Sequence, residues 1–538
     1  MVSVIADESR NISKVEQLIV CVRYVFNENV KERFVDFVAL SDLDSQSLST
    51  AIAECLTKNK IPLKYCVAQC YDGASVMSGR MNGVQARFRE LCKTPCIYVH
   101  CHAHRLNLVL VDACAQVRCA GDVLGLLELI YVFISVSSLR HGKFISIQQN
   151  DNVKVLEMPM QSDTRWVCKL KAVSTFKNRL KQVMHLLKFY SSEGKPVERT
   201  ECSGLLLQIN FTTVFMLHLL HDILVLVNGL SKYMQGRKAS VFRACKLVKA
   251  TVATIRALRS DESFQKLIVS ATEHCQCCNI FVPNSIDAVF GQSNFENARF
   301  SGKSCRSSTK LPMQLSDCLV MSTLGQRRSY VSTSESGNFS NDTDDLRIQM
   351  YEVIDRVIAE MTRRFSDNEP LLIACETVDP SSDIFMDYDY MKPVADWYVD
   401  FGIDSNKLRA QTTVVKEMFR GNRNANVSEV LKSLLSMKCG EKSVFPDLLA
   451  FVHLVMTLPV SSAQAERTFS TMKRVKNYLR STMGDERLSD LCLLSVERDL
   501  SYDMMKNPEN LVDAFANEGN RRARLQLRNE SVRLTSSC

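Results

Sequence analysis

Runs of β-branched and aromatic residues alternate with polar links along the first forty residues of the chain. The runs occupy residues 2–7, 16–26 and 31–40, and only short polar segments separate them. Runs of this length that are rich in Val, Ile and Phe are typical of strands. Because short links join antiparallel neighbours, the pattern predicts three strands in an antiparallel meander.

Helical and strand-like periods then follow one another. Apolar residues recur at intervals of three or four within residues 45–60, and a second helix is expected at about residues 74–92. Strand-like runs lie at residues 63–72 and 96–101, and a long helix is expected from about His104. The resulting order, β-β-β-α-β-α-β-α, predicts an α/β layer with a mixed sheet.

Helical periods dominate from about Thr164 to Phe445, and no convincing strand pair is expected there. Ser, Thr, Asn, Gly and Arg crowd residues 301–343, which predicts a disordered loop. A third pattern begins at Phe445 with a long apolar run. Within it Ser461 and Gln464 have the spacing of a capping box, which predicts that a helix starts at this serine.

These patterns, together with an arginine-rich end, divide the chain into four predicted parts. The first is α/β, the second is an all-helical block, the third is an apolar helical region, and the fourth is a basic flexible tail. Their boundaries are set at residues 1–165, 166–444, 445–500 and 501–538.

Composition narrows the class of protein. Of the 538 residues, 46% are hydrophobic and 23% are charged, which is typical of a globular chain and excludes wholesale disorder or a collagen. The net charge of +8 is compatible with a nucleic-acid partner without requiring one. The 21 cysteines are scattered, and the N-terminus lacks the pattern of a secretory leader, so free thiols in a reducing compartment are expected.

Two apolar stretches approach the length of a membrane span, at residues 123–139 and 204–230. Glu128 interrupts the first, and several His, Asn, Gln and Asp residues interrupt the second. A span needs about 20 predominantly apolar residues. Both stretches are therefore predicted to be buried helices, and no membrane partner is expected.

Three carboxylates are candidates for metal chemistry. Asp7 and Asp72 each lie at the end of a predicted strand, and Glu466 lies at the start of a predicted helix. Mg²⁺ prefers carboxylate oxygens and water, and acids from neighbouring strand ends closed by one from a helix would supply them. Each acid also has a simpler interpretation, as a turn residue, a solvated strand end or a complement to the helix dipole.

Cys101 and His104 form a C-x-x-H pair with further His and Cys residues nearby. The pair has three interpretations: a zinc site, a strand-to-helix junction with core thiols, or an element beside an active site. A structural zinc is disfavoured, because the cysteines and histidines do not form a clean pair of pairs. His274 and the cysteines next to it lack a second set of metal ligands nearby in the sequence, so we interpret them as clustered thiols.

Several segments resemble the successive motifs of hAT-superfamily transposases, in the order of that family and over nearly the whole chain. The resemblance is greatest to host-domesticated relatives of the zinc-finger MYM-type protein 1-like and TTF-type finger kinds. Its most specific part is the C-terminal dimerisation segment. The segments are ADES (6–9), EQLIVCVRYV (16–25), QCYDGASVMSGRMNGVQARF (69–88), YVHCHAHRLNLVL (98–110), SDTRW (162–166) and LPVSSAQAERTFSTMKRVKNYLRSTMGDERLSDLCLLSV (458–496).

The resemblance implies an RNase H-like mixed sheet interrupted by a large all-α insertion and followed by a helical dimerisation region. It implies a DDE triad at Asp7, Asp72 and Glu466 that would hold Mg²⁺ or Mn²⁺ for DNA cleavage and strand transfer. It also implies that Trp166 stacks on a base, with Arg165 beside it at the DNA. Trp166 has an equally good interpretation as a half-buried core residue. The family reading is favoured for Cys101 and His104 and places them near the active site.

The resemblance further implies self-association through the C-terminal region. The apolar residues of this region could equally form the core of a single chain. The resemblance implies that the same surface serves both as core and as dimer contact. The residues are Phe469, Met472, Val475, Leu479, Leu488 and Leu491.

Location and activity follow from the same resemblance. DNA is the expected further partner and the nucleus the expected location. Whether the chain is an active transposase, a truncated remnant or a domesticated non-catalytic regulator stays open. The chain begins six residues before Asp7, so a zinc-binding DNA-recognition domain upstream of the sheet is expected to be missing from it.

Overall fold

A mixed five-stranded sheet forms the N-terminal part of the computed structural model. The strands are β1 (Val2–Arg10), β2 (Glu16–Phe26), β3 (Asn29–Ala39), β4 (Cys66–Tyr71) and β5 (Ile97–His100), in the order β3-β2-β1-β4-β5. The first three pair antiparallel, whereas β1–β4 and β4–β5 pair parallel. The structure describes residues 1–10, 12–160, 166–237, 239–283, 342–365, 369–422, 425, 427–439 and 442–517.

Both faces of the sheet are buried, as the alternation along its strands shows. Val4 and Ala6 pack in one apolar cluster with the helices α1 (Ser45–Lys58) and α3 (Val84–Cys92), whereas Ile5 belongs to the large cluster on the opposite face. Successive side chains of a strand point to opposite faces, so this division follows from the period of two. The helices α18 (Pro446–Thr457) and α19 (Ala463–Val475) pack against the strands from far along the chain.

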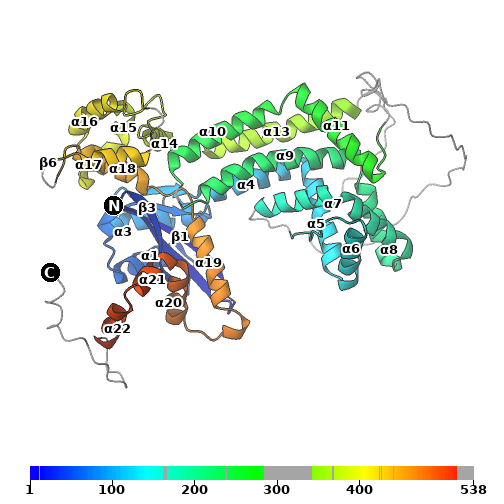
Figure 1. Ribbon diagram of the computed structural model, residues 1–538, viewed down its shortest axis with the longest axis horizontal. Helices are drawn as coiled ribbons and strands as arrows, with labels where there is room; N and C mark the ends of the chain where they lie inside the picture. Colours follow the sequence, from blue (N-terminus) through cyan, green and yellow to red (C-terminus); the bar gives the residue numbers. More distant parts are fainter. Residues whose placement is uncertain are drawn as a thin grey trace, which may run out of the picture.

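Most of the remaining chain is helical. The long helices α4, α9, α10, α11 and α13 extend away from the sheet, and α14 to α18 form a second group beside it (Figure 1). The helices are α4 (His102–Gln116), α5 (Arg118–Ser135), α6 (Ser138–Asn150), α7 (Trp166–Glu193), α8 (Pro196–Gln208), α9 (Phe211–Met234), α10 (Val241–Ala257), α11 (Asp261–Cys278), α13 (Asp342–Phe365), α14 (Glu369–Glu376), α15 (Tyr388–Ala395), η2 (Asp396–Phe401), α16 (Ser405–Met418) and α17 (Val427–Ser436).

The helix α9 has the length and apolar character of a membrane span, with a mean hydropathy of 1.7 in its most apolar window. Of that window 61% is buried inside the protein, where α9 contacts α7, α10 and α11. The pair α5 and α6 passes the same test only if counted as one span, although it bends by 104°. Burial of this kind is what the core helix of a helical block requires.

The predicted element order of the first hundred residues is confirmed, with a local difference in the second helix. The single helix expected at residues 74–92 is two helices, α2 (Ser75–Ser78) and α3. Gly79 and Gly83 come so close that a Cβ on Gly83 would lie 2.4 Å from the Gly79 amide nitrogen. The chain therefore turns between them instead of continuing as a helix.

Further differences lie toward the C-terminus. A short strand pair, β6 (Lys438–Cys439) and β7 (Lys442–Ser443), occurs where none was expected. The predicted capping box is wrong, because Ser461 is buried and its hydroxyl donates to the Met234 carbonyl at 2.8 Å.

The predicted flexible tail is helical at its start. The helix α20 (Asp485–Val496) is followed by α21 (Arg498–Met505) and α22 (Pro508–Asn517), so residues 501–517 belong to these last two helices. Residues 518–538 lie outside the described part of the chain, as do residues 301–341 of the loop predicted at 301–343, whereas residues 342 and 343 belong to α13. The cysteines whose side chains are described are all free thiols, as predicted.

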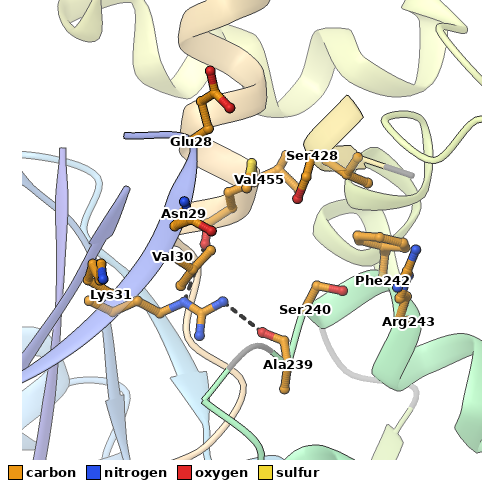
Figure 2. A pocket seen from close by; sticks show the side chains of 13 residues that line it. Glu28, Asn29, Val30, Lys31, Ala239, Ser240, Phe242, Arg243, Ser428 and Val455 are labelled. Carbon is orange, nitrogen blue, oxygen red and sulfur yellow. Dashed lines mark hydrogen bonds between the residues drawn. The ribbon is translucent and has the colours of Figure 1, made fainter. Parts of the chain in front are cut away.

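A buried arginine joins the sheet to the helical segments. Arg23 on β2 is 1% exposed and forms an ion pair of 2.8 Å with Glu32 on β3. Its guanidinium also donates to the carbonyls of Ala239, before α10, and Met456, on α18, at 2.7 and 3.3 Å. Figure 2 shows the cavity of about 440 Å³ at this joint, where the dashed line ends at Ala239.

Replacing Arg23 by Met is expected to destabilise the protein by about 3 kcal/mol, because it leaves Glu32 buried with only the longer ion pair of 3.5 Å to Arg467. Urea denaturation followed by circular dichroism measures the change. Arg420→Met is the control, because the Arg420 side chain is 80% exposed and its loss should change stability by less than about 0.5 kcal/mol. Equal effects of the two variants would contradict a structural role for Arg23.

Candidate functional site

Two of the three candidate acids lie at adjacent parallel strands. Asp72 directly follows the end of β4, as predicted, whereas Asp7 lies inside β1, which continues to Arg10, so its predicted place at a strand end is wrong. In the register of β1 and β4, Ile5 lies opposite Cys70. Asp7 and Asp72 are each two residues further on and so share the sheet face of Ile5 and Cys70. The parallel pairing therefore brings together two carboxylates that are 65 residues apart in the sequence.

The third acid comes from the helix that covers the same face. Glu466 lies in the first turn of α19, which packs against β1, β2 and β3. Burial, and after it the carboxylates of Glu466 and Asp72, raise the pKa of Asp7 well above its ordinary value of 3.8. Asp72 and Glu466 thus both act electrostatically on Asp7. Within the described residues, no three His, Cys, Asp or Glu side chains close into a group that could hold a metal ion.

Local hydrogen bonds orient the two aspartates. One Asp72 carboxylate oxygen accepts from the Ala74 amide at 3.0 Å, and the Asp72 carbonyl accepts from the Tyr98 hydroxyl at 2.7 Å. One Asp7 carboxylate oxygen accepts from the Glu8 amide at 3.1 Å. The turn after Asp72 depends on glycine, because a Cβ on Gly73 would lie 2.4 Å from the His100 ring. These bonds occupy one oxygen of each carboxylate.

Cys101 and His102 fix the segment that leads into α19. The Cys101 sulfur accepts from the Ser462 amide at 3.2 Å and from the Ser462 hydroxyl at 3.3 Å. The backbone amide and ring Nδ1 of His102 each lie 3.0 Å from the Val460 carbonyl oxygen. Because Glu466 follows only four residues after Ser462, this contact sets the position of Glu466 against β1.

The C-x-x-H pair takes part in a strand-to-helix junction. The Cys101 sulfur caps α4 by accepting from the His104 amide at 3.4 Å. The pKa of the Cys101 thiol is lowered to about 7, first by a hydrogen bond with the Cys70 thiol and then by those from Ser462. Cys101 also contributes to the raised pKa of Asp7. The strand-to-helix junction therefore lies beside the acids. The interpretation of the pair as a junction and its interpretation as an element beside an active site both apply to this one position.

The residues predicted to contact DNA stay predictions. Arg165 lies outside the described residues. Trp166 is the first residue of α7, but its side chain is not among those described.

The apolar residues assigned to dimerisation have mixed positions. Phe469, Met472 and Leu488 are 6%, 1% and 0% exposed within one chain, so they form core and are not available to a partner. They are buried because α19 and α20 pack against the sheet and each other. Val475 and Leu491 are half-buried, whereas Leu479 is 96% exposed.

Other apolar side chains around the C-terminal helices are exposed, and the sequence analysis did not select them. These side chains lie within the predicted dimerisation segment or in the helices after it. In the sequence, only the apolar pattern that continues beyond that segment indicates them. They are Leu493, Leu494, Leu500, Tyr502, Met504, Met505, Val512 and Phe515.

A basic cavity of about 780 Å³ lies along α19 and α20. Arg237, Arg467, Arg474 and Arg498 line it together with one acid, Asp499. Arg33 binds Asp499 through two hydrogen bonds of 2.7 Å and lowers the pKa of this acid to about 2. The cavity wall is therefore positive, and Arg467 places it next to Glu466. Arg237 lies in the turn that follows α9, far from α19 in the sequence, so no local sequence pattern indicated that it lines this cavity.

Comparison with known proteins identifies both ends of the chain. Residues 1–83 match the ZMYM1/FAM200 RNase-like domain, and residues 419–500 match the hAT family C-terminal dimerisation region. The chain thus resembles hAT-derived proteins at both ends. The resemblance inferred from the motifs is thereby confirmed. The first match contains Asp7 and Asp72, and the second contains Glu466.

Curated relatives extend over nearly the whole chain. The mouse and human proteins called 52 kDa repressor of the inhibitor of the protein kinase are each 22% identical to it, over 96% and 93% of its length. The chain spans 64% and 62% of the lengths of these two relatives.

Asp7→Asn is expected to raise the midpoint of thermal unfolding at pH 7. Because the folded-state pKa of Asp7 is raised, the wild type loses stability as the pH rises from about 3.8 through that pKa, and the neutral amide avoids this loss. Each kcal/mol of relieved repulsion corresponds to roughly 2–4 °C.

Scanning calorimetry at pH 4 and pH 7 measures the difference between the wild type and Asp7→Asn. The gain should shrink at the lower pH. Asp490→Asn, at an exposed position of α20, is the control and should leave the midpoint unchanged. A lower midpoint for Asp7→Asn at pH 7 would show that Asp7 is a structural acceptor and not a repelled member of an acidic cluster.

Proposed function

We propose that the chain is a self-associating, DNA-binding nuclear protein whose RNase H-like sheet keeps a divalent-metal site. The observation that carries this proposal is the placement of Asp7 and Asp72 on one face of the sheet under the helix that carries Glu466, and the raised pKa of Asp7 agrees with it. Repulsion among three carboxylates is what a bound Mg²⁺ or Mn²⁺ would relieve.

The arrangement of the chain supports an RNase H-like fold interrupted by a helical insertion. The strands β1 to β5 end at His100, and α18 and α19 return to the same sheet after Pro446. The long helices between them extend away from the sheet, as Figure 1 shows. We interpret the region between α4 and α18 as the insertion, which would leave the two sequence-distant parts of the site in one unit.

The chemistry of the donor set suits the proposed ion, which would have to draw together three acids that do not close into one group within the described residues. Asp7, Asp72 and Glu466 supply only carboxylate oxygens, the ligand type that Mg²⁺ prefers. The local hydrogen bonds described above occupy one oxygen of each aspartate. A bound ion would activate a water or hydroxyl for phosphodiester chemistry. The residues of the chain would hold the ion and place the acids beside the basic cavity.

DNA binding is supported by that basic cavity. Arg467, Arg474 and Arg498 come from one continuous C-terminal region, and Arg237 joins them from the helical block. Guanidinium groups bind phosphate oxygens with paired hydrogen bonds, and their number sets the salt dependence of binding. The position of Arg467 next to Glu466 would bring a DNA phosphate close to the acids.

A second candidate function is regulation without catalysis. The two curated relatives are named as repressors, which favours a regulatory protein that keeps the fold and the dimerisation surface. The two functions differ in whether the acids bind a metal ion, whereas self-association belongs to both.

Isothermal titration with Mn²⁺ tests the acidic site. The wild type is expected to bind, and Asp72→Asn is expected to weaken binding at least tenfold, about 1.4 kcal/mol, because it removes one charged ligand. Asp490→Asn should bind like the wild type. Identical binding curves for the wild type and Asp72→Asn would refute the metal site and leave the regulatory function.

Self-association is tested at an exposed leucine of the hAT region. Leu494 is 56% exposed on α20, so Leu494→Asp should weaken the dimer without unfolding the chain. Leu207→Asp is the matched control, because Leu207 is 81% exposed on α8. Light scattering coupled to size exclusion measures the mass at several concentrations. An unchanged dimer for Leu494→Asp would exclude this part of the surface.

The buried Phe469 provides a contrast to Leu494. Phe469→Asp places a charge in the core and is expected to lower stability instead of giving a folded monomer. Circular dichroism of the same samples distinguishes the two results. A folded monomer from Phe469→Asp would reverse the assignment of this residue to the core.

A further inference from the structure

A second cavity, of about 660 Å³, shares a wall with the acidic site. Tyr98 and His100 line it, and the same two side chains contact Asp72 and Gly73, by a hydrogen bond and by close packing. The cavity therefore lies on the other side of the turn that carries Asp72. Its lining residues are Ser78, Arg80, Gln85, Arg89, Pro95, Ile97, Tyr98, His100, Arg105 and Trp397.

The wall of this cavity is strongly positive. Arg80, Arg89 and Arg105 contribute three guanidinium groups, and none of the lining residues in the described chain is acidic. Two of these groups are held in place. Arg89 donates to the Gln85 side-chain oxygen at 3.2 Å, and Arg105 donates to the Arg364 carbonyl at 2.7 Å. Converging, fixed guanidinium groups are suited to a phosphate group.

His100 adds a polar atom that the protein itself leaves without a partner. Its Nε2 is buried, and no hydrogen-bond partner for it occurs among the described residues. A buried polar atom without a partner is unfavourable, so a ligand that reaches it and supplies the partner gains from the contact. Burial, and after it the charge of Arg105, lowers the pKa of His100 to about 3, so the ring is neutral and can donate or accept.

Trp397 closes the cavity from the helical part of the chain. It lies on η2, and half of its side chain (50%) is exposed. The indole of Trp397 lines the cavity, and the other walls of the cavity come from β5, α3 and α4. An exposed aromatic ring beside phosphate-binding groups is the arrangement on which nucleic-acid bases stack.

We propose that this cavity binds one nucleotide of a single DNA strand, with its phosphate on Arg80, Arg89 and Arg105 and its base on Trp397. The inference rests on the proposed DNA binding and deepens it by naming a single-stranded segment next to Asp72. Free nucleotides share the same chemistry, so the test includes them as a separate ligand. The basic cavity along α19 is a different surface and serves duplex phosphates.

The chain offers a direct optical probe, because it contains only two tryptophans. The difference in fluorescence between the wild type and Trp397→Phe therefore reports on Trp397, while Trp166, which the resemblance places at the DNA, is the same in both proteins. Titration with an eight-nucleotide single-stranded DNA is expected to quench the Trp397 fluorescence. Thymidine monophosphate and inorganic phosphate are titrated in parallel and should compete only at concentrations at least a hundredfold higher, because each supplies a smaller part of the contact.

Arginine variants separate specific binding from general charge. Arg80 and Arg89 are exposed, so Arg80→Ala and Arg89→Ala should fold normally, which thermal melts check. Each is expected to weaken quenching by the oligonucleotide at least tenfold, whereas Arg420→Ala, an equal loss of charge elsewhere, should not. Trp397→Ala should weaken binding of a fluorescein-labelled oligonucleotide by a similar factor in anisotropy.

The outcomes distinguish this inference from the function on which it rests. If the wild type binds duplex DNA but the oligonucleotide leaves Trp397 fluorescence unchanged, the cavity is refuted and the proposed function stands. Equal quenching by thymidine monophosphate would overturn a DNA strand as the ligand. Equal binding by Arg89→Ala and the wild type would overturn the phosphate contact. Absence of all DNA binding by the wild type would contradict the proposed function itself.

Discussion

The buried ion pair between Arg23 and Glu32 is the interaction on which the arrangement of the site depends. A guanidinium inside a protein needs several acceptors, and Arg23 finds them in a strand, in the segment before α10 and in α18. These three segments cannot separate without leaving a charge unpaired. Glu32 also holds Arg467 at 3.5 Å, so the same network reaches the residue next to Glu466. The sheet thus fixes the helix that completes the acidic site through charge and not through apolar contact alone.

In the acidic site a helix that is firmly held in place lies beside a carboxylate whose charged form is disfavoured. The contacts of Cys101 and His102 with Val460 and Ser462 hold α19 in place, while burial and neighbouring carboxylates disfavour the charged form of Asp7. A frame that tolerates this repulsion is typical of functional sites, where groups are arranged for a task and not for stability. The two basic cavities lie on either side, one next to Glu466 and one behind Asp72. Positive walls therefore lie close to the acids.

The local pattern of apolar and polar residues predicted those features of the fold that depend on local structure. The strands emerged from their period of two, and β2 has the predicted ends because alternation and polar links coincide at Glu16 and Phe26. The break at Gly79 and Gly83 was missed because it depends on two backbones meeting. Phe469 and Met472 could not be assigned to core or interface, since the periodicity of α19 is the same for both. Trp397 carried no signal, because its neighbours in the cavity come from other elements that only the fold brings together.

The contact between His102 and Val460 spans 358 residues, and this separation affects how the chain is made. The sheet face that carries Ile5, Ile19 and Cys21 is covered by helices that end at Val475. At a synthesis rate of about 5–20 residues per second, the strands wait roughly 20–90 s after β3 leaves the ribosome before that cover exists. During this interval an apolar sheet face is open to other chains. Expression of this protein should therefore depend on chaperones that hold a partly made chain, and truncation before α19 should give aggregates instead of a smaller folded unit.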